Sequence, residues 1–212
     1  MQVTYNPAVF AVNDIAQAMS IILTPEGSTT EERWKTETPY LADMIAEQFA
    51  LGPDSLVLDY GCGIGRLAHE LINRHNCRVV GIDISPSMRA LSVIYARSDR
   101  FMSCSHEMLE ALIARGAGFD LALAIWVLQH CAEPAQDIGR IRRALRPGGG
   151  LFVANGNARS VPTAERGWFN DGLDIRTMLA GEFDLVCDGQ LAREKTTATL
   201  AELTFWGAYR CP

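Results

Sequence analysis

Three glycines at alternate positions form the most distinctive chemical feature of the sequence. They are Gly61, Gly63 and Gly65, which follow the apolar run Val57-Leu58. Glycine adopts backbone conformations closed to other residues and lets a ligand approach the main chain without a Cβ in the way. A helix predicted to begin near Ile64 adds free N–H groups and the positive end of its dipole. This loop therefore predicts a site where a small ligand lies against the backbone.

An acidic residue follows the next predicted strand. Asp83 comes directly after residues 79–82, about twenty residues beyond the glycines. In nucleotide-binding α/β folds a carboxylate at this place accepts hydrogen bonds from both ribose hydroxyls. The alternative is local, with Asp83 and Ser85 sharing the cap of the next helix. The glycine loop and the acid together favour a ligand that carries a ribose.

The elements that would position these residues alternate between short apolar runs and amphipathic stretches, a pattern typical of strand-helix-strand units. Strands are predicted at residues 56–58, 79–82, 101–102, 121–125, 151–153 and 183–187, with an antiparallel last strand at 204–211. Ser85 and Pro86 would start a helix that buries Met88, Leu91 and Tyr95 on one face. The fold class is therefore α/β, with a doubly wound, mostly parallel seven-stranded sheet.

The region before the first strand is predicted to be helical. One helix covers residues 13–22, a second begins at the capping box of residues 28–31, and a third is opened by Thr38 and Pro39 and runs toward Phe49. Residues 1–52 would form a helical cap of the same domain that residues 53–212 complete.

Composition limits the class of protein. The chain has 212 residues and is 48% hydrophobic, which suits one domain with a sizeable core. A net charge of −6 and a pI near 5.2 argue against a nucleic-acid or anionic-membrane partner. No apolar run reaches the ~18 residues of a membrane span, and no leader is apparent. The six cysteines form no CxxC pair, so reduced thiols, no metal site and a cytoplasmic location are expected. The sequence makes no prediction of oligomeric state.

Four ordered blocks between residues 55 and 154 carry a resemblance. They read VLDYGCGIGRL, VVGIDIS, FDLALAIWVLQH and LRPGGGLFVA. In these blocks the chain resembles the class I S-adenosylmethionine-dependent methyltransferases. The resemblance implies S-adenosylmethionine as the cofactor and implies roles for residues of the first, second and third blocks.

The implied cofactor contacts follow the order of the strands. The methionine portion would be held by Asp59 and by the glycine loop residues Gly61, Cys62, Gly63 and Gly65. Asp83 would bind the ribose hydroxyls, and Ile84 and Met88 would flank the adenine. Ile125 would line the methionine arm. Many relatives carry an acid after the third strand, where this chain has Ser105 and His106. Ser105 and the backbone of His106 are the expected adenine contacts, against the alternative that His106 is a surface residue at a helix start.

The acceptor end of the predicted cleft lies after the fourth and fifth strands. His130 follows the fourth strand and is the candidate catalytic base, because imidazole titrates near neutral pH. The alternative is that His130 only satisfies backbone groups. Trp168 and Phe169, in the long connection 155–172, would cover the acceptor from one side. Arg33, Trp34 and Tyr40 would close the other side, or all these aromatic residues pack the cap onto the sheet.

The function predicted from these residues is in-line methyl transfer from S-adenosylmethionine to a small-molecule acceptor in a desolvated cleft. A cofactor-binding module without catalysis that acts through partners is the main alternative, and aminopropyl transfer is disfavoured because no acidic cluster suits a polyamine. An NAD-dependent oxidoreductase would use Gly63-x-Gly65-x-x-Ala68, but residues 59–62 intervene between the strand and that motif. A DNA base is disfavoured because no Asn/Asp-Pro-Pro-aromatic tetrad follows the fourth strand. The arginines of residues 140–146 are interpreted as a solvated helix face.

Overall fold

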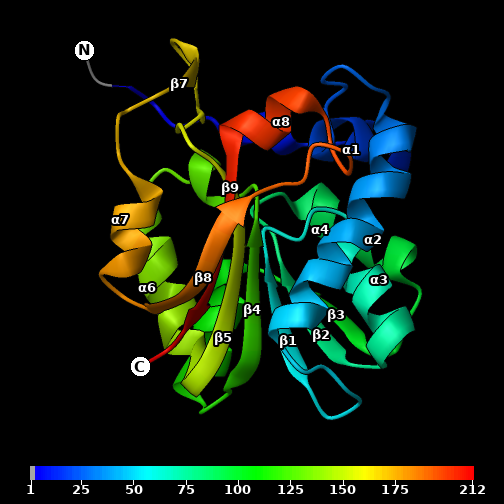
Figure 1. Cartoon of the computed structure of the whole chain (residues 1–212), viewed down its shortest axis with the longest axis vertical. Helices are drawn as coiled ribbons and strands as arrows, with labels where there is room; N and C mark the ends of the chain where they lie inside the picture. The colour runs from blue at the N-terminus through cyan, green and yellow to red at the C-terminus, as the bar shows by residue number, and fades with distance from the viewer. Residues whose placement is uncertain (1–2) are drawn as a thin grey trace.

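A central seven-stranded sheet organises the computed structural model, which describes residues 3–212. Its strand order is β3-β2-β1-β4-β5-β9-β8, and only β9 runs antiparallel to its neighbours (Figure 1). The strands are β1 (Leu56–Tyr60), β2 (Arg78–Ile82), β3 (Phe101–Cys104), β4 (Phe119–Ile125), β5 (Leu145–Gly156), β8 (Asp184–Gln190) and β9 (Thr204–Arg210). The predicted mostly parallel sheet with an antiparallel last strand is confirmed.

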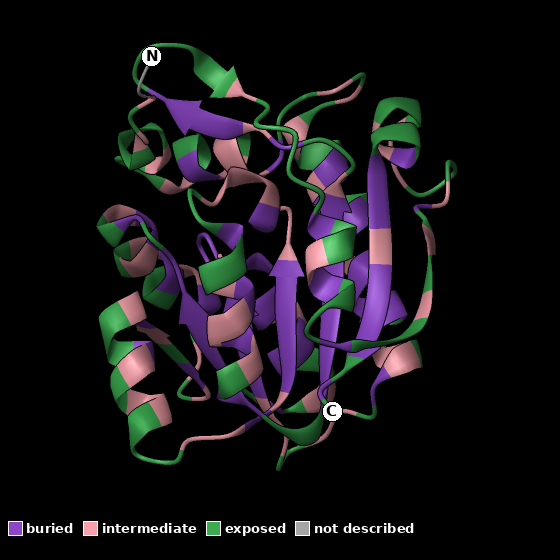
Figure 2. Ribbon diagram, turned by 90° about the vertical axis from the view of Figure 1, so that its left-hand side faces the viewer, coloured by how far each residue is buried: buried purple, intermediate pink, exposed green. Residues whose placement is uncertain are grey.

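Helices cover both faces of this sheet, so its central strands are buried on both sides, as Figure 2 shows. One face packs against α5 (His106–Ala114), α6 (Pro134–Ala144) and α7 (Ile175–Ala180). The other packs against α2 (Thr30–Gln48), α3 (Arg66–His75) and α4 (Pro86–Ala96). Neighbouring residues of β1 alternate between the two cores, with Val57 in one and Leu58 in the other. This two-sided burial explains why the strands are continuous apolar runs in the sequence.

The N-terminal helices differ from the prediction in one respect. The first is α1 (Ile15–Ile22), but the predicted second and third helices are one continuous helix, α2. Its N-cap is Thr29, whose hydroxyl accepts from the N–H of Glu32 at 3.1 Å. Pro39 lies inside α2 and lacks the N–H for the carbonyl one turn back. Packing of Leu41 and Ile45 in the core offsets that loss.

The connection after β5 is not a plain loop. It forms a small antiparallel hairpin of β6 (Val161–Thr163) and β7 (Gly167–Phe169). Tyr5 pairs with Thr163 as an antiparallel bridge, and the Asn6 N–H donates to the carbonyl of Pro162 at 2.9 Å. The N-terminal segment and its short 3-10 helix η1 (Pro7–Phe10) are thereby tied to the hairpin.

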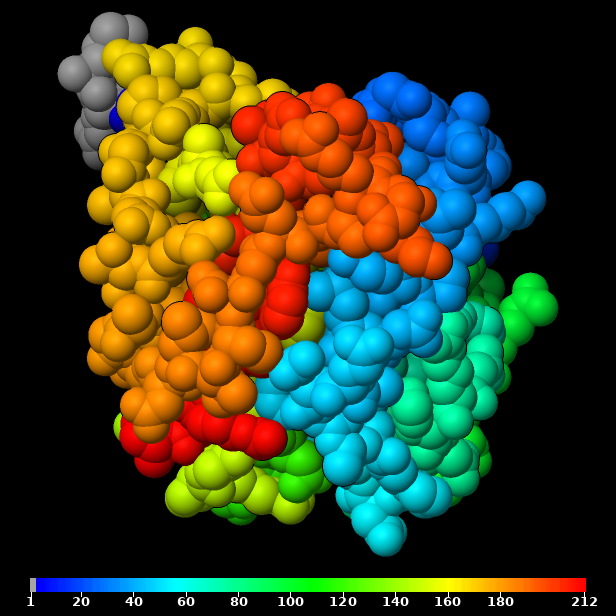
Figure 3. All heavy atoms as spheres, in the orientation of Figure 1, coloured from blue at the N-terminus to red at the C-terminus, as the bar shows by residue number. Residues whose placement is uncertain are grey.

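One end of the molecule gathers elements that are distant in sequence. The α1 helix, the β7 hairpin strand and α8 (Ala198–Leu203) lie together at the top of Figure 1. In Figure 3 the orange and red segment before β9 packs against the blue N-terminal region. A hydrogen bond of 2.8 Å from the Thr196 hydroxyl to Glu37 joins these two segments. Among residues 3–212, no helix is long and apolar enough to cross a membrane.

Candidate functional site

A cavity of about 730 Å³ opens at the carboxyl ends of the parallel strands. This size lies within the ~300–1,000 Å³ typical of small-molecule sites. The glycine loop after β1, the residues after β2 and β4, helix α1 and the N-terminal segment supply its walls. Its position matches the crevice where open α/β sheets bind ligands.

The glycine loop forms the floor of this cavity with backbone in the left-handed region that favours glycine. Gly61 has a φ of 77° and Gly63 a φ of 54°. A Cβ on Gly61 would lie 2.4 Å from Val127, and one on Gly63 would lie 2.6 Å from Ile22. The loop is pinned by the N–H groups of Gly61 and Cys62, which both donate to the carbonyl of Ile82. The bare backbone predicted from the sequence is therefore present at the cavity wall.

Asp83 braces this loop from the end of β2. One carboxylate oxygen accepts from the N–H of Gly63 at 2.9 Å, and the other from the N–H of Ser85 at 2.8 Å. Burial raises the pKa of Asp83, although both hydrogen bonds and nearby Arg89 oppose the rise. Each oxygen keeps a second acceptor site, and the residue lines the cavity. Asp83 therefore accepts a hydrogen bond at the start of the next helix and also faces the cavity.

A second buried acid and a buried base flank the loop. Asp59, at 3% exposure, has its pKa raised to about 7 by burial, while the Arg66 guanidinium opposes the rise. Arg66, at 4% exposure, has its pKa lowered by burial to about 10, so it is charged at neutral pH. Both side chains line the cavity. The cavity floor therefore offers one fixed cation beside an acid that titrates near neutrality.

Most of the predicted site residues line the cavity. These are Asp59, Gly61, Cys62, Gly63, Asp83, Ile84, Met88, His106, Ile125 and His130. Ile84 is 41% exposed there, which leaves an apolar surface free for a ring. Gly65 and Ser105 are not among the lining residues. Gly65 caps α3 with a φ of 79°, and the Ser105 hydroxyl caps α5 by accepting from the Met108 N–H.

His130 is held in one tautomer at the cavity wall. Its Nδ1 lies 2.6 Å from the carbonyl of Ser160, which can only accept, so Nδ1 carries the proton. Its Nε2 lies 3.1 Å from the side-chain nitrogen of Gln129, and Gln129 itself accepts from the N–H of Gly156. Burial, with a smaller contribution from Arg159, lowers the pKa of His130. The imidazole is therefore neutral at pH 7, with its unprotonated nitrogen facing an amide donor.

Aromatic side chains gather around His130. The rings of Phe10 and Trp168 lie 5.8 and 5.3 Å from the imidazole, centre to centre, and 6.1 Å from each other. Trp168 is 57% exposed, so this cluster stands at the rim of the cavity. Tyr5 also lines the cavity, and burial raises the pKa of its phenol. The sequence predicted Trp168 at this place but not Tyr5 and Phe10. These two residues lie at the cavity because the N-terminal segment pairs with the β6–β7 hairpin.

The part of the cavity wall formed by Tyr60 and helix α6 contains a polar network that the sequence did not predict. Arg140 donates to the Tyr60 hydroxyl and to Asp137, both at 2.7 Å, and to Glu110 at 2.8 Å. The Tyr60 hydroxyl donates to Asp137. Arg140 lines the cavity, so the prediction of a solvated arginine face is wrong for this residue. It holds for Arg143, which is half exposed.

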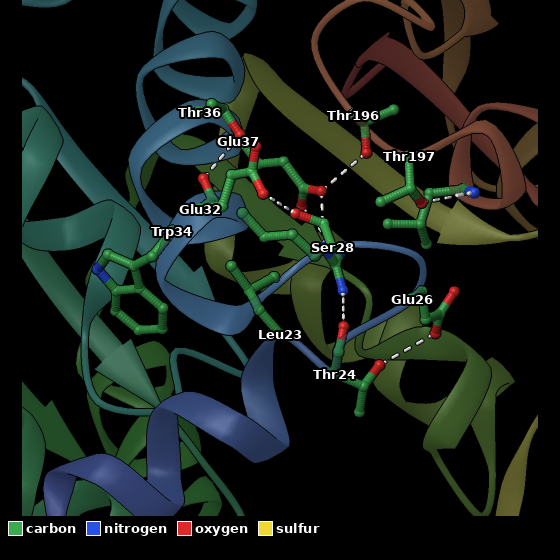
Figure 4. A network of polar contacts seen from close by, with 12 residues as sticks. Leu23, Thr24, Glu26, Ser28, Glu32, Trp34, Thr36, Glu37, Thr196 and Thr197 are labelled. Carbon is green, nitrogen blue, oxygen red and sulfur yellow. Dashed lines mark hydrogen bonds and ion pairs between the residues drawn. The ribbon is translucent and has the colours of Figure 1, made fainter.

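Arg33, from α2, lines the cavity as predicted, and its guanidinium donates to other residues of the protein. Its Nε and one terminal nitrogen donate to the two oxygens of buried Glu37 at 2.7 and 2.9 Å. Its other terminal nitrogen donates to the carbonyl of Thr24. Figure 4 shows this network, with Thr196 donating to Glu37 from the far segment and Trp34 turned away. Tyr40 contacts the backbone of Ala192 instead of the cavity.

Comparison with known proteins gives two kinds of match. A family model described as a methyltransferase domain matches residues 58–153. The O-methyltransferase resE of Aspergillus sclerotiorum is 28% identical over 133 residues, 61% of this chain and 50% of that protein. A ubiquinone biosynthesis O-methyltransferase of Methylobacterium sp. (strain 4-46) is 33% identical over 112 residues, 50% of this chain and 45% of that protein. The chain spans about half the length of the curated relatives it matches.

Solved structures extend the likeness over the whole fold. The N-methyltransferase NodS of Bradyrhizobium japonicum WM9, solved with S-adenosylhomocysteine, superposes with a TM-score of 0.65. The match covers 92% of this chain and 97% of NodS at 18% sequence identity. At that identity the likeness shows a common fold.

Proposed function

We propose that the chain carries a class I S-adenosylmethionine-dependent methyltransferase domain and that the protein transfers a methyl group from S-adenosylmethionine to a small-molecule acceptor. The observation that carries the proposal is the braced glycine loop at residues 61–65, with Asp83 beside it at one cavity. Both curated relatives described above are O-methyltransferases, which makes a hydroxyl oxygen the first nucleophile to test.

The cavity suits this cofactor in shape and chemistry. The positions of Gly61 and Gly63, where a Cβ would clash, bring bare backbone to the ligand. Asp83 has acceptor capacity left for hydroxyls, and exposed Ile84 offers a surface for a flat base. These contacts, with Asp59 at the methionine end, support the assignments of the sequence analysis. Gly65 and Ser105 would act indirectly, by shaping the helix starts.

The chemistry asks little of the protein beyond positioning. The cofactor supplies a sulfonium methyl that is already electrophilic. The chain must hold an acceptor in line with that methyl and exclude water, which lowers the barrier mainly through proximity and desolvation. Phe10 and Trp168 line the cavity beside His130 and would cover the acceptor there.

His130 is the proposed proton acceptor for a hydroxyl substrate. Its Ser160 contact fixes the proton on Nδ1 and leaves the Nε2 lone pair toward Gln129. An acceptor hydroxyl would replace the Gln129 amide as the donor to Nε2. The competing interpretation is that His130 only ties residue 160 to the 3-10 helix η2 (Leu128–His130).

We also propose that residues 1–52 act as a cap of one domain with residues 53–212, supported by the Tyr5–Thr163 bridge and the Glu37–Thr196 hydrogen bond. A cytoplasmic location without a nucleic-acid partner remains part of the proposal. Its support is the net charge of −6 and the six free cysteines.

The proposed function is tested by mass spectrometry of S-adenosylhomocysteine formation. The purified protein is incubated with S-adenosylmethionine and fractionated metabolite extracts, and each active fraction is searched for a methylated product. The proposal predicts stoichiometric formation of both products in some fractions. Cofactor binding with no turnover in any fraction would favour the non-catalytic module instead.

A further inference from the structure

Arg66 is a buried cation that forms no close ion pair within residues 3–212, and only the more distant charges of Glu37 and Asp59 act on it. It is 4% exposed, and among residues 3–212 the Thr38 hydroxyl, at 3.1 Å, is its only side-chain hydrogen-bond acceptor. No carboxylate of the described residues lies within 4 Å of it, unlike Arg33 and Arg140, the other two arginines of the cavity wall. A guanidinium has five N–H donors, so most of its capacity faces the cavity. Burying such a charge unpaired is costly, which points to a bound anion.

Two tryptophans hold this guanidinium in place. Its central carbon lies 5.5 Å from the centre of the Trp34 ring and 5.9 Å from that of Trp126. Trp34 is fixed by a 2.9 Å hydrogen bond from its indole N–H to the Tyr95 hydroxyl. Trp126 has a φ of 51°, a left-handed conformation that is rare for a bulky residue and is usually found at functional sites. The strained backbone therefore places a ring against a cation that aims into the cavity.

The anion has a defined place relative to the cofactor contacts. Arg66 follows the glycine loop directly and lies on the same side of the cavity as Asp59, whose charge acts on it. We propose that Arg66 is the carboxylate subsite of the cavity and binds the α-carboxylate of the S-adenosyl ligand. This inference rests on the proposed function, because it needs that ligand in the cavity.

The assignment separates the roles of two cations. Three N–H groups of Arg33 donate to Glu37 and the Thr24 carbonyl, so its charge is already matched by a buried carboxylate and it stabilises the cap. Arg66 keeps free donors in a fork that matches a carboxylate bidentately. Asp59 beside it would then face the ligand ammonium, so that the two charges of the amino-acid end are each matched by one buried side chain.

The test compares two ligands that differ only in the carboxylate. Calorimetry measures binding of S-adenosylhomocysteine and of its decarboxylated analogue, 5′-deoxy-5′-(3-aminopropylthio)adenosine, to wild type, Arg66→Met and Arg66→Lys. Wild type should prefer S-adenosylhomocysteine by about 10- to 100-fold, the scale of hydrogen bonds between charged groups. The preference should fall to about threefold or less in Arg66→Met and to an intermediate value in Arg66→Lys.

Arg74→Met is the matched control. Arg74 also lies on helix α3 and pairs with Asp43 and Glu70 at the surface, away from the cavity. The substitution Arg74→Met therefore removes the same charge from the same helix without changing the cavity wall. Its ligand preference should equal that of wild type. An undiminished preference in Arg66→Met would overturn the assignment, and would leave an acceptor carboxylate as the anion to seek. Failure of wild type to bind either ligand would instead count against the proposed function.

Discussion

Binding of S-adenosylhomocysteine should release a proton from Asp59. This carboxyl is buried in the cavity wall, and burial raises its pKa from 3.8 to about 7. A ligand ammonium beside it would favour the charged form, as an opposite charge typically lowers an acid's pKa by ~1–3 units. The ligand therefore binds better to the ionised carboxylate.

The expected proton count follows from that pKa. In the ligand-free protein at pH 7, Asp59 is about half protonated, so binding should release roughly 0.4–0.5 proton. The release should be about 0.4–0.9 proton near pH 6, larger for a larger shift, and fall to almost none above about pH 8.5. Affinity should accordingly rise with pH between about 5 and 7 and then level off. Because the folded pKa exceeds the unfolded one, the ligand-free protein should also lose stability as pH rises through this window.

Calorimetry in buffers of different ionisation enthalpy measures this release directly. The apparent binding enthalpy should vary linearly with the buffer enthalpy, with a slope that reports the proton count. Asp59→Asn, which cannot titrate, should remove most of the slope. Identical enthalpies in all buffers, proton uptake, or an undiminished slope in Asp59→Asn would refute the placement of the ligand ammonium beside Asp59.

Four further substitutions test the remaining assignments. Asp83→Ala should weaken S-adenosylhomocysteine binding by about 1.5–3 kcal/mol, and unchanged affinity in a folded variant would remove Asp83 from the site. Trp168→Ala should raise the acceptor KM or lower kcat with cofactor affinity unchanged, whereas a joint fall in affinity and Tm would make the residue structural. His130→Gln should lower turnover by ~10²-fold, and a loss below about threefold with an unmoved pH–rate profile would exclude a general base. Arg33→Met should cost about 3–5 kcal/mol in urea unfolding by leaving Glu37 without its cation, and adding Glu37→Leu should recover most of it, whereas no recovery would mean that the pair itself is strongly stabilising.

The sheet and the meeting of the glycine loop with Asp83 at one cavity could be predicted because their signals are local. Strands buried on both faces must be apolar throughout, so residues 121–125 stand out without any knowledge of their neighbours. The glycine loop and Asp83 each follow the end of a strand, and because β1 and β2 are adjacent and parallel, the Gly63 N–H and the Asp83 carboxylate come together at the same sheet edge.

The features that the sequence did not reveal depend on long-range contacts. Pro39 indicates a helix start by its local preference, but core packing carries α2 through it. Tyr5 reaches the cavity only because its backbone pairs with Thr163, far along the chain. Arg66 is the first residue of α3, and nothing in the sequence of that helix indicates that this side chain is buried and forms no ion pair with a carboxylate.

The central claim, that the glycine loop and Asp83 form a site for an S-adenosyl ligand, is tested most directly by one calorimetric titration of the wild-type protein. S-adenosylhomocysteine should bind with one site per chain, and NAD in excess should not displace it, because the motif that begins at Gly61 after β1 has Arg66 where the dinucleotide fingerprint has its third small residue. Binding of NAD with no response to S-adenosylhomocysteine or S-adenosylmethionine would contradict the account.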